Sequence, residues 1–111
     1  MITPANRRLY ARKVLRRAAI VVLPGGVKRE VKTWDLGQDG MAILSPKPIS
    51  PGTRCEMTLE LPQGDRSTEL SVPVKVVYCS FSGSDGFKVG MSFGDLDADA
   101  AAAIQQFSAA T

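Results

Sequence analysis

The side chains best suited to binding a charged ligand are clustered near the N-terminus. Residues 7–17 contain six basic residues and no acidic one: Arg7, Arg8, Arg12, Lys13, Arg16 and Arg17. An arginine can pair with a phosphate through two N–H groups, bind the edge of a base, or stack on an aromatic ring. Residues 1–32 carry a net charge of +8 (nine bases, one acid) and residues 33–111 carry −5 (five bases, ten acids), which sums to +3. This asymmetry predicts an anionic partner near the N-terminus.

The second candidate site is the short loop Asp35–Gly40, with the sequence Asp-Leu-Gly-Gln-Asp-Gly. Its start is similar to a calcium-binding loop, but Pro46 occupies the twelfth position, where such a loop needs a glutamate. Gly37 and Gly40 also match the Gly-x-x-Gly clamp of KH domains, but strands are expected on both sides. The plain alternative is a tight connection between two strands that uses glycine for a positive φ angle.

Composition excludes several kinds of chemistry. The chain has no histidine, which removes the usual general base and the commonest metal ligand, and with them every nucleophilic dyad built on histidine. Cys55 and Cys79 lie far apart in the sequence. We expect both to be buried apolar residues rather than zinc ligands, with a single disulfide as the alternative. The sequence therefore predicts a binding protein and not an enzyme, with no metal and no cofactor.

Hydrophobic patterns predict a mainly β fold. In residues 54–61 apolar and polar side chains alternate, which is typical of a half-buried strand. After Asp97, which can cap a helix, the spacing becomes helical, with one apolar face made by Ala100, Ala103, Ile104 and Phe107. The expected strands are 14–23, 27–34, 41–44, 54–61, 70–76 and 87–93. Short strands joined by Gly and Pro turns and followed by one helix predict a six-stranded antiparallel β-barrel with a C-terminal α-helix.

The same patterns predict one domain. We expect residues 1–13 to form a flexible basic arm and residues 14–111 to form the barrel and its helix. Pro73 interrupts an expected strand and cannot donate a ladder hydrogen bond, so it should lie at an edge or in a bulge. No apolar run approaches the length of about 20 residues that a membrane span needs. The N-terminus also lacks the order of a signal peptide, so a cytoplasmic protein without membrane insertion is expected.

Together, the basic arm and the acidic loop resemble the PilZ domain family. That family has an RxxxR motif before its first strand and a [D/N]xSxxG motif after its second. Here Arg8-Leu9-Tyr10-Ala11-Arg12 precedes the first expected strand, and Asp35–Gly40 follows the second. The closing strand 87–93 and the C-terminal helix also look like those of the family, so the resemblance covers nearly the whole chain. It implies a bacterial receptor for the second messenger cyclic di-GMP.

The resemblance also implies roles for particular residues. Arg8 and Arg12 would bind guanine and phosphate, and Arg7 could supplement them. Asp35 would accept hydrogen bonds from guanine N1 and N2, and Gly40 would allow the ligand to approach the backbone closely.

Two positions depart from a simple match. Position 37 is Gly where the family usually has Ser, which removes a hydroxyl that could bind the ligand. Arg12 and Arg16 also have RxxxR spacing. We prefer Arg8 and Arg12 because Arg16 is expected to lie already within the first strand.

The implied partners are cyclic di-GMP and an unidentified effector protein, with a role in control of motility, pili or exopolysaccharide. The alternative is a PilZ-like adaptor that binds proteins but no nucleotide. A nucleic-acid partner is disfavoured because only Tyr10 and Trp34 offer aromatic platforms near the basic segment, and because residues 33–111 carry −5. The chain is expected to be a monomer or a homodimer.

Overall fold

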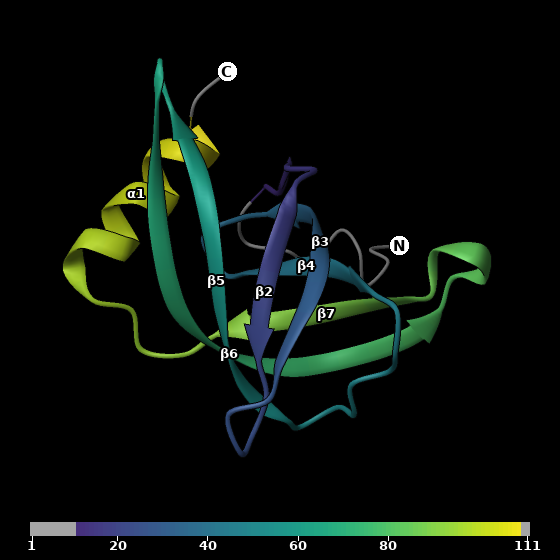
Figure 1. The fold of residues 1–111 in the computed structure, drawn as a ribbon. Coiled ribbons are helices and arrows are strands. Elements are labelled where there is room, and N and C mark those ends of the chain that lie inside the picture. Colours follow the sequence, from purple (N-terminus) through teal and green to yellow (C-terminus); the bar gives the residue numbers. More distant parts are fainter. Residues whose placement is uncertain (1–10, 110–111) are drawn as a thin grey trace, which may run out of the picture.

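The computed structural model of the chain describes residues 11–109, so Arg7 and Arg8 lie outside the described residues. The strands in chain order are β1 (Lys13–Val14), β2 (Ala18–Val22), β3 (Lys28–Leu36), β4 (Gly40–Ser45), β5 (Arg54–Gln63), β6 (Arg66–Phe81) and β7 (Phe87–Phe93), followed by the helix α1 (Ala98–Ala109). Figure 1 shows the strands wrapped around a common centre, with α1 beside β5 and β6.

The strands form one antiparallel sheet that closes on itself. Neighbours run in the order β3, β2, β5, β6, β7 and β4, and β4 pairs again with β3 to complete the circle. The predicted six-stranded antiparallel barrel with one C-terminal helix is therefore confirmed. The short β1 is additional and pairs with the end of β3, through Lys13 opposite Leu36 and Val14 opposite Asp35.

The expected first strand, 14–23, is interrupted. β1 ends at Val14 and β2 begins at Ala18, so Arg16 lies between two strands and the prediction that it lies within a strand is wrong. The cause is Thr33 on β3, whose side chain is buried. Its hydroxyl donates a hydrogen bond to the Leu15 carbonyl at 2.5 Å and accepts one from the Arg17 N–H at 3.1 Å. Backbone bonds to β3 continue on both sides of Arg16, from the Leu15 N–H to the Trp34 carbonyl and from the Thr33 N–H to the Arg17 carbonyl.

Inward-facing side chains fill the barrel. Those that are almost fully buried include Val21, Leu36, Met41, Ile43, Met57, Leu61, Val72, Val89 and Met91. They follow the period of two that the sequence shows in 54–61, because alternate residues of a strand face opposite sides of the sheet. The burial of these apolar surfaces is the main favourable contribution to folding.

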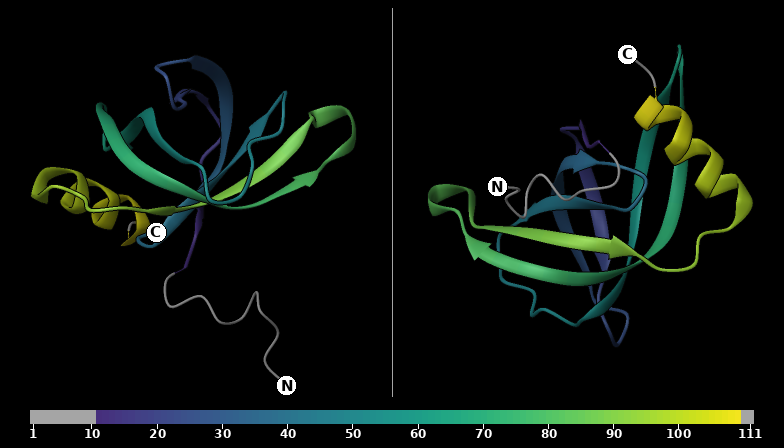
Figure 2. Two further views of the ribbon diagram at one scale, coloured as in Figure 1. Left: turned by 90° about the horizontal axis from the view of Figure 1, so that it is seen from below. Right: turned by 180° about the vertical axis from the view of Figure 1, so that it is seen from behind.

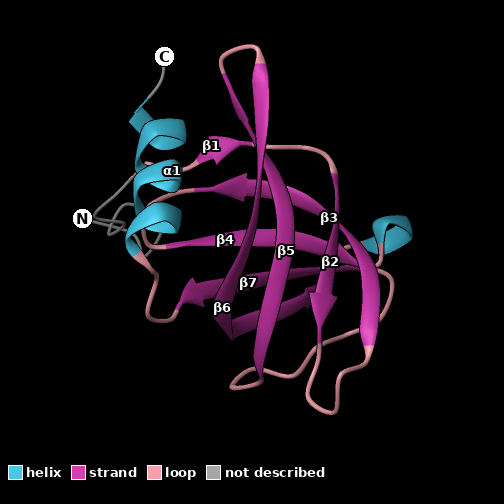
Figure 3. Ribbon diagram, turned by 60° about the vertical axis from the view of Figure 1, so that its left-hand side comes forward, coloured by secondary structure: helices cyan, strands magenta, loops and turns pink. Residues whose placement is uncertain are grey.

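The predicted helix is confirmed, including its cap. The Ala100 N–H donates to Asp97 Oδ1 at 2.7 Å, which satisfies one of the unpaired N–H groups at the start of the helix. The buried face is the predicted one, made by Ala100, Ala103, Ile104 and Phe107, and it belongs to the same apolar cluster as the barrel interior. Figure 3 shows that β1 lies next to this helix. Lys13 connects the two, since its Nζ donates to the Phe107 carbonyl at 3.4 Å.

Turns occur where the sequence predicts them. Gly25 and Gly26 between β2 and β3 have φ angles of +87° and +82°, which a side chain would disfavour. Pro73 lies one residue beyond the last β6–β7 pair, Val74 opposite Phe93, so its missing N–H interrupts no ladder bond. β6 nevertheless lies between β5 and β7 in the closed sheet, and Pro73 stands opposite Glu56 of β5, so the prediction of an edge strand is wrong. The irregularity of β6 lies between Val76 and Tyr78 and not at Pro73. The β6–β7 hairpin projects at the opposite end of the barrel from α1 (Figure 2).

Cys55 and Cys79 are both free and half-buried against the apolar core, so the alternative of a disulfide is not realised. Burial raises the pKa of the Cys55 thiol, an effect that the charge of Arg29 partly offsets, so the thiol is protonated at neutral pH. Within residues 11–109, no helix has the length and apolar character needed to cross a membrane.

Candidate ligand-binding site

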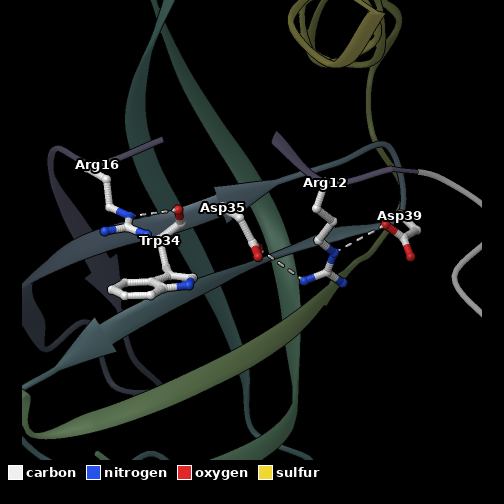
Figure 4. A network of polar contacts seen from close by, with 5 residues as sticks. All are labelled: Arg12, Arg16, Trp34, Asp35 and Asp39. Atoms are coloured by element: carbon white, nitrogen blue, oxygen red, sulfur yellow. Dashed lines mark hydrogen bonds and ion pairs between the residues drawn. The ribbon is translucent and has the colours of Figure 1, made fainter. Parts of the chain in front are cut away.

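Arg12 and Asp35, two of the predicted site residues, meet on the outside of the barrel (Figure 4). Arg12 Nη1 donates a hydrogen bond to Asp35 Oδ1 at 3.4 Å, and Arg12 Nε lies 3.6 Å from Asp39 Oδ1. The side chains of Arg12 and Asp35 are only 12% and 15% exposed, whereas that of Asp39 is 35% exposed. An arginine from the N-terminal segment is therefore held between one carboxylate near the end of β3 and one in the β3–β4 connection.

Strand register explains this meeting. Val14 pairs with Asp35 and Lys13 with Leu36, so the preceding Arg12 falls beside the turn that follows β3. The turn is closed by the Gly37 N–H, which donates to the Gly40 carbonyl at 2.9 Å. Asp35 stands opposite Ala42, whose neighbours on β4 face the core, so Asp35 points outward.

Gly37 and Gly40 are needed here for space and not for backbone angle. Neither has a positive φ, so the expectation of a turn that uses left-handed glycines is wrong at this loop. A Cβ at Gly40 would lie 2.1 Å from the Met91 carbonyl oxygen, so its close neighbour is β7. A Cβ at Gly37 would lie 2.9 Å from the Ala11 carbonyl oxygen and 3.1 Å from Arg12 Cγ. Glycine at 37 therefore allows the N-terminal segment to lie directly on the turn.

The group formed by Arg12, Asp35 and Asp39 has a net charge of −1 and unused hydrogen-bonding capacity. Arg12 Nε and Asp39 Oδ1 are both buried, and neither makes a hydrogen bond. Buried polar atoms without partners are uncommon in native proteins. Asp39 was part of the sequence motif but not of the predicted site. The second acidic residue of Asp-Leu-Gly-Gln-Asp-Gly was the signal that could have identified it.

A second group lies next to Asp35 along β3. The Arg16 guanidinium carbon is 3.5 Å from the centre of the Trp34 ring, and Arg16 Nε donates to the Trp34 carbonyl at 3.4 Å. Lys88 Nζ, on β7, is 5.5 Å from the same ring centre. Figure 4 shows Arg16 and Trp34 on one side of Asp35 and Arg12 with Asp39 on the other. The sequence indicates Trp34 only as an aromatic platform for nucleic acid, and Arg16 lies outside the strand that the sequence predicts for it.

On the outer face beside Asp35, two small residues, Ala42 and Gly90, separate Asp35 from Tyr78. Asp35, Ala42, Gly90 and Tyr78 stand opposite one another across β3, β4, β7 and β6. A Cβ at Gly90 would lie 2.0 Å from Tyr78 Cε2, so the Tyr78 ring lies directly across Gly90. This side of the site is therefore walled by an aromatic ring.

A hollow of about 1410 Å³ on the described surface does not contain Arg12 or Asp35, and it reaches the second group only through Arg16. Its lining mixes four acidic residues with Arg16, Arg17 and Lys32, so its charge does not favour an anionic ligand over the face around Asp35. We therefore place the candidate site at the charged face around Asp35 and not in the hollow.

The chain is a small closed antiparallel β-barrel domain in which Arg12 forms ion pairs with acidic residues at the end of β3 and in the β3–β4 turn. The PilZ domain family profile matches residues 6–110, and the chain belongs to this family. Sequence comparison with curated proteins finds no significant match.

Solved structures share the fold at low sequence identity. The inhibitor of motility MotI/DgrA of Bacillus subtilis has a TM-score of 0.77 and 14% identity, over 92% of this chain and 49% of that one. PlzA of Borreliella burgdorferi, solved in complex with c-di-GMP, has a TM-score of 0.67 and 16% identity, over 94% and 42%. The PilZ domain of CeSA from a cellulose-synthesizing bacterium has a TM-score of 0.62 and 16% identity, over 85% and 90%. The chain thus spans about half, or less, of the first two proteins.

Proposed function

We propose that this PilZ domain is a receptor for cyclic di-GMP, which it binds on the outer face of the barrel around Arg12 and Asp35. The observation that carries the proposal is the convergence of these two residues, 23 positions apart, at 3.4 Å on the outer face of the barrel, where both side chains remain partly exposed. Family membership and the nucleotide-bound PlzA structure support the same ligand.

The chemistry of the site suits a guanine nucleotide. A carboxylate accepts hydrogen bonds, and guanine presents N1–H and N2–H as adjacent donors, so Asp35 can hold that edge of the base. A guanidinium can pair with phosphate oxygens or with guanine O6 and N7, which suits Arg12. Asp39 shares Arg12 and adjusts how firmly it is held in the absence of ligand.

The remaining site assignments belong to the same proposal. Arg8 joins Arg12 in binding guanine and phosphate, and Arg7 supplements them with positive charge; all three belong to the N-terminal arm, residues 1–13. Gly37 and Gly40 keep the turn narrow, so that Arg12 and the ligand both reach it. The absence of a side chain at position 37 leaves backbone groups in place of the usual serine hydroxyl.

The domain acts by binding and not by catalysis. It relays the signal of the bound ligand to an effector protein in the cytoplasm. Control of motility or of exopolysaccharide is the physiological role we infer, in keeping with the motility inhibitor and the CeSA domain that share its fold. A protein-binding adaptor that takes no nucleotide is the second candidate. It is favoured by Arg12, which is already occupied by two carboxylates.

Titration calorimetry with cyclic di-GMP tests the proposal. We expect the wild type to bind, and we expect Asp35→Ala and Arg12→Ala each to weaken binding about tenfold or more, because one good base-edge contact is worth about 1–3 kcal/mol. Matched controls are Asp65→Ala and Arg54→Ala, which remove the same charges from exposed positions elsewhere on β5 and its turn. Both controls should bind like the wild type.

The adaptor hypothesis makes the opposite prediction. It requires no heat with millimolar cyclic di-GMP and no shift in the amide resonances of Asp35, Gly37 or Gly40. Losses in the site variants that are no larger than those in the matched controls would also contradict a defined site.

A further inference from the structure

We propose that Arg16, Trp34 and Lys88 form a second subsite, which binds the half of a cyclic dinucleotide that Asp35 does not hold. In this subsite a purine ring stacks on the free face of the Arg16 guanidinium, and Arg16 and Lys88 neutralise a phosphate. The inference rests on the proposed function and extends it to three residues that the site assignments above do not include.

The first argument is geometric. One face of the Arg16 guanidinium lies on the Trp34 ring at 3.5 Å, and the Arg16 side chain is otherwise exposed. A guanidinium supported in this way presents its second face to solvent as a flat cationic surface, which suits an aromatic base. Trp34 directly precedes Asp35 in β3, so the two subsites are adjacent (Figure 4).

The second argument concerns local backbone structure. Two irregularities occur opposite each other: the interruption between β1 and β2 at Arg16, and the register shift of β3 between Thr33 and Asp35 at Trp34. The hydroxyl of Thr33, which is 1% exposed, binds Leu15 and Arg17 on both sides of Arg16. A regular ladder would have directed these two side chains elsewhere, and bulges commonly redirect a side chain next to a binding site.

The third argument is the charge balance. Arg12, Asp35 and Asp39 together carry −1, whereas a cyclic dinucleotide carries two phosphate charges. Within residues 11–109 no carboxylate forms an ion pair with Arg16 or Lys88, whose positive charges therefore remain available. Lys32 adds a third cation in the same row, since it stands opposite Leu44, which in turn stands opposite Lys88. The positive charge that the phosphates need thus lies beside Trp34.

Trp34 gives a direct readout because it is the only tryptophan of the chain. We expect cyclic di-GMP to change the intensity of Trp34 emission, with a midpoint equal to the dissociation constant from calorimetry. The full chain is used, and free GMP serves as a probe that carries only one base. At concentrations where GMP occupies the Asp35 subsite, we expect it to change Trp34 emission much less than cyclic di-GMP does.

Variants separate stacking from charge. We expect Arg16→Gln to weaken cyclic di-GMP binding about tenfold, Arg16→Lys to weaken it severalfold because the charge stays but the plane is lost, and Lys88→Gln to weaken it about threefold or more. Arg17→Gln is the matched control for Arg16, because it is the next residue and its Nη1 donates to the Glu60 carbonyl on β5. Lys75→Gln, exposed on β6, is the control for Lys88. Both controls should retain wild-type affinity.

The outcomes distinguish the two proposals. If the wild type binds and Asp35→Ala does not, while Arg16→Gln and Lys88→Gln bind normally with unchanged Trp34 emission, the second subsite is wrong and the receptor proposal stands. If the wild type does not bind at all, both proposals fail. Equal losses of affinity for cyclic di-GMP in Arg16→Gln and Arg17→Gln would show that only the positive charge matters. That result would contradict the second subsite.

Discussion

Arg12 is the residue on which the site depends, because it contacts both carboxylates of the turn. In the absence of ligand, Arg12 occupies the Asp35 oxygen that a guanine edge would need. A ligand must therefore either displace this contact or share it. Exchange of one charge-assisted hydrogen bond for another changes the free energy little, so affinity depends on the additional contacts that a dinucleotide brings.

Substitution of Gly37 tests whether the N-terminal segment lies directly on the β3–β4 turn. A methyl group at this position would press on the Ala11 carbonyl oxygen, 2.9 Å from the ideal Cβ. We expect Gly37→Ala to lower the free energy of unfolding by about 1 kcal/mol, because small overpacking changes cost about 1–3 kcal/mol. The Arg12 Nε–H resonance should shift as Arg12 moves away from Asp39. Denaturant titration and NMR measure the two effects.

Gly94→Ala is the control for this substitution. The three heavy atoms nearest to its Cβ would all belong to Pro73, at 3.3 to 3.7 Å, and none belongs to Arg12 or Ala11. We expect a change of less than about 0.5 kcal/mol. An unchanged Arg12 resonance in Gly37→Ala would show that the N-terminal segment does not rest on the turn.

At the scale of elements, Thr33 holds the interruption that exposes Arg16. Its hydroxyl serves Leu15 and Arg17 in a buried position. Thr33→Val keeps the shape but leaves both backbone groups unsatisfied, which should cost about 1–3 kcal/mol of stability. Thermal unfolding measures this loss. The emission spectrum of Trp34 in the folded variant should also change, because Arg16 is no longer held over the ring.

Thr58→Val is the matched control. Thr58 also makes a hydroxyl hydrogen bond, to Ser71 at 3.1 Å, but this bond is exposed and water can replace it. We expect a loss below about 0.5 kcal/mol. Equal costs for the two substitutions would contradict the role given to Thr33.

Much of the fold could be predicted from sequence because it depends on local periodicity. The strand 87–93 and the buried helix face follow directly from side-chain spacing. The interruption at Arg16 could not be predicted from the sequence. It depends on hydrogen bonds of the Thr33 side chain, 17 positions along the chain, and the spacing of apolar residues does not indicate such a bond. Of the site, Arg12 and Asp35 were found from their motifs, whereas the stacking of Arg16 on Trp34 requires both irregularities and was missed.

At the scale of the whole molecule, the two adjacent residues Arg12 and Lys13 connect the β3–β4 turn with the C-terminal helix. Arg12 contacts the turn, and the next residue, Lys13, lies with its Nζ 5.1 Å from the Phe107 ring centre on α1. A ligand that repositions Arg12 therefore acts one residue away from a contact with the helix. This adjacency gives the domain a short physical route from the nucleotide to a surface that an effector could bind.

The central claim is that the Asp35 face recognises guanine, and base selectivity tests it most directly. Adenine lacks the N1–H and N2–H donors that Asp35 would bind, while cyclic di-AMP carries the same two phosphate charges as cyclic di-GMP. In parallel calorimetric titrations of the wild type, we predict binding of cyclic di-GMP at least about tenfold tighter than binding of cyclic di-AMP, with this preference lost in Asp35→Ala. Equal affinity for the two dinucleotides, or a preference that survives in Asp35→Ala, would contradict the account.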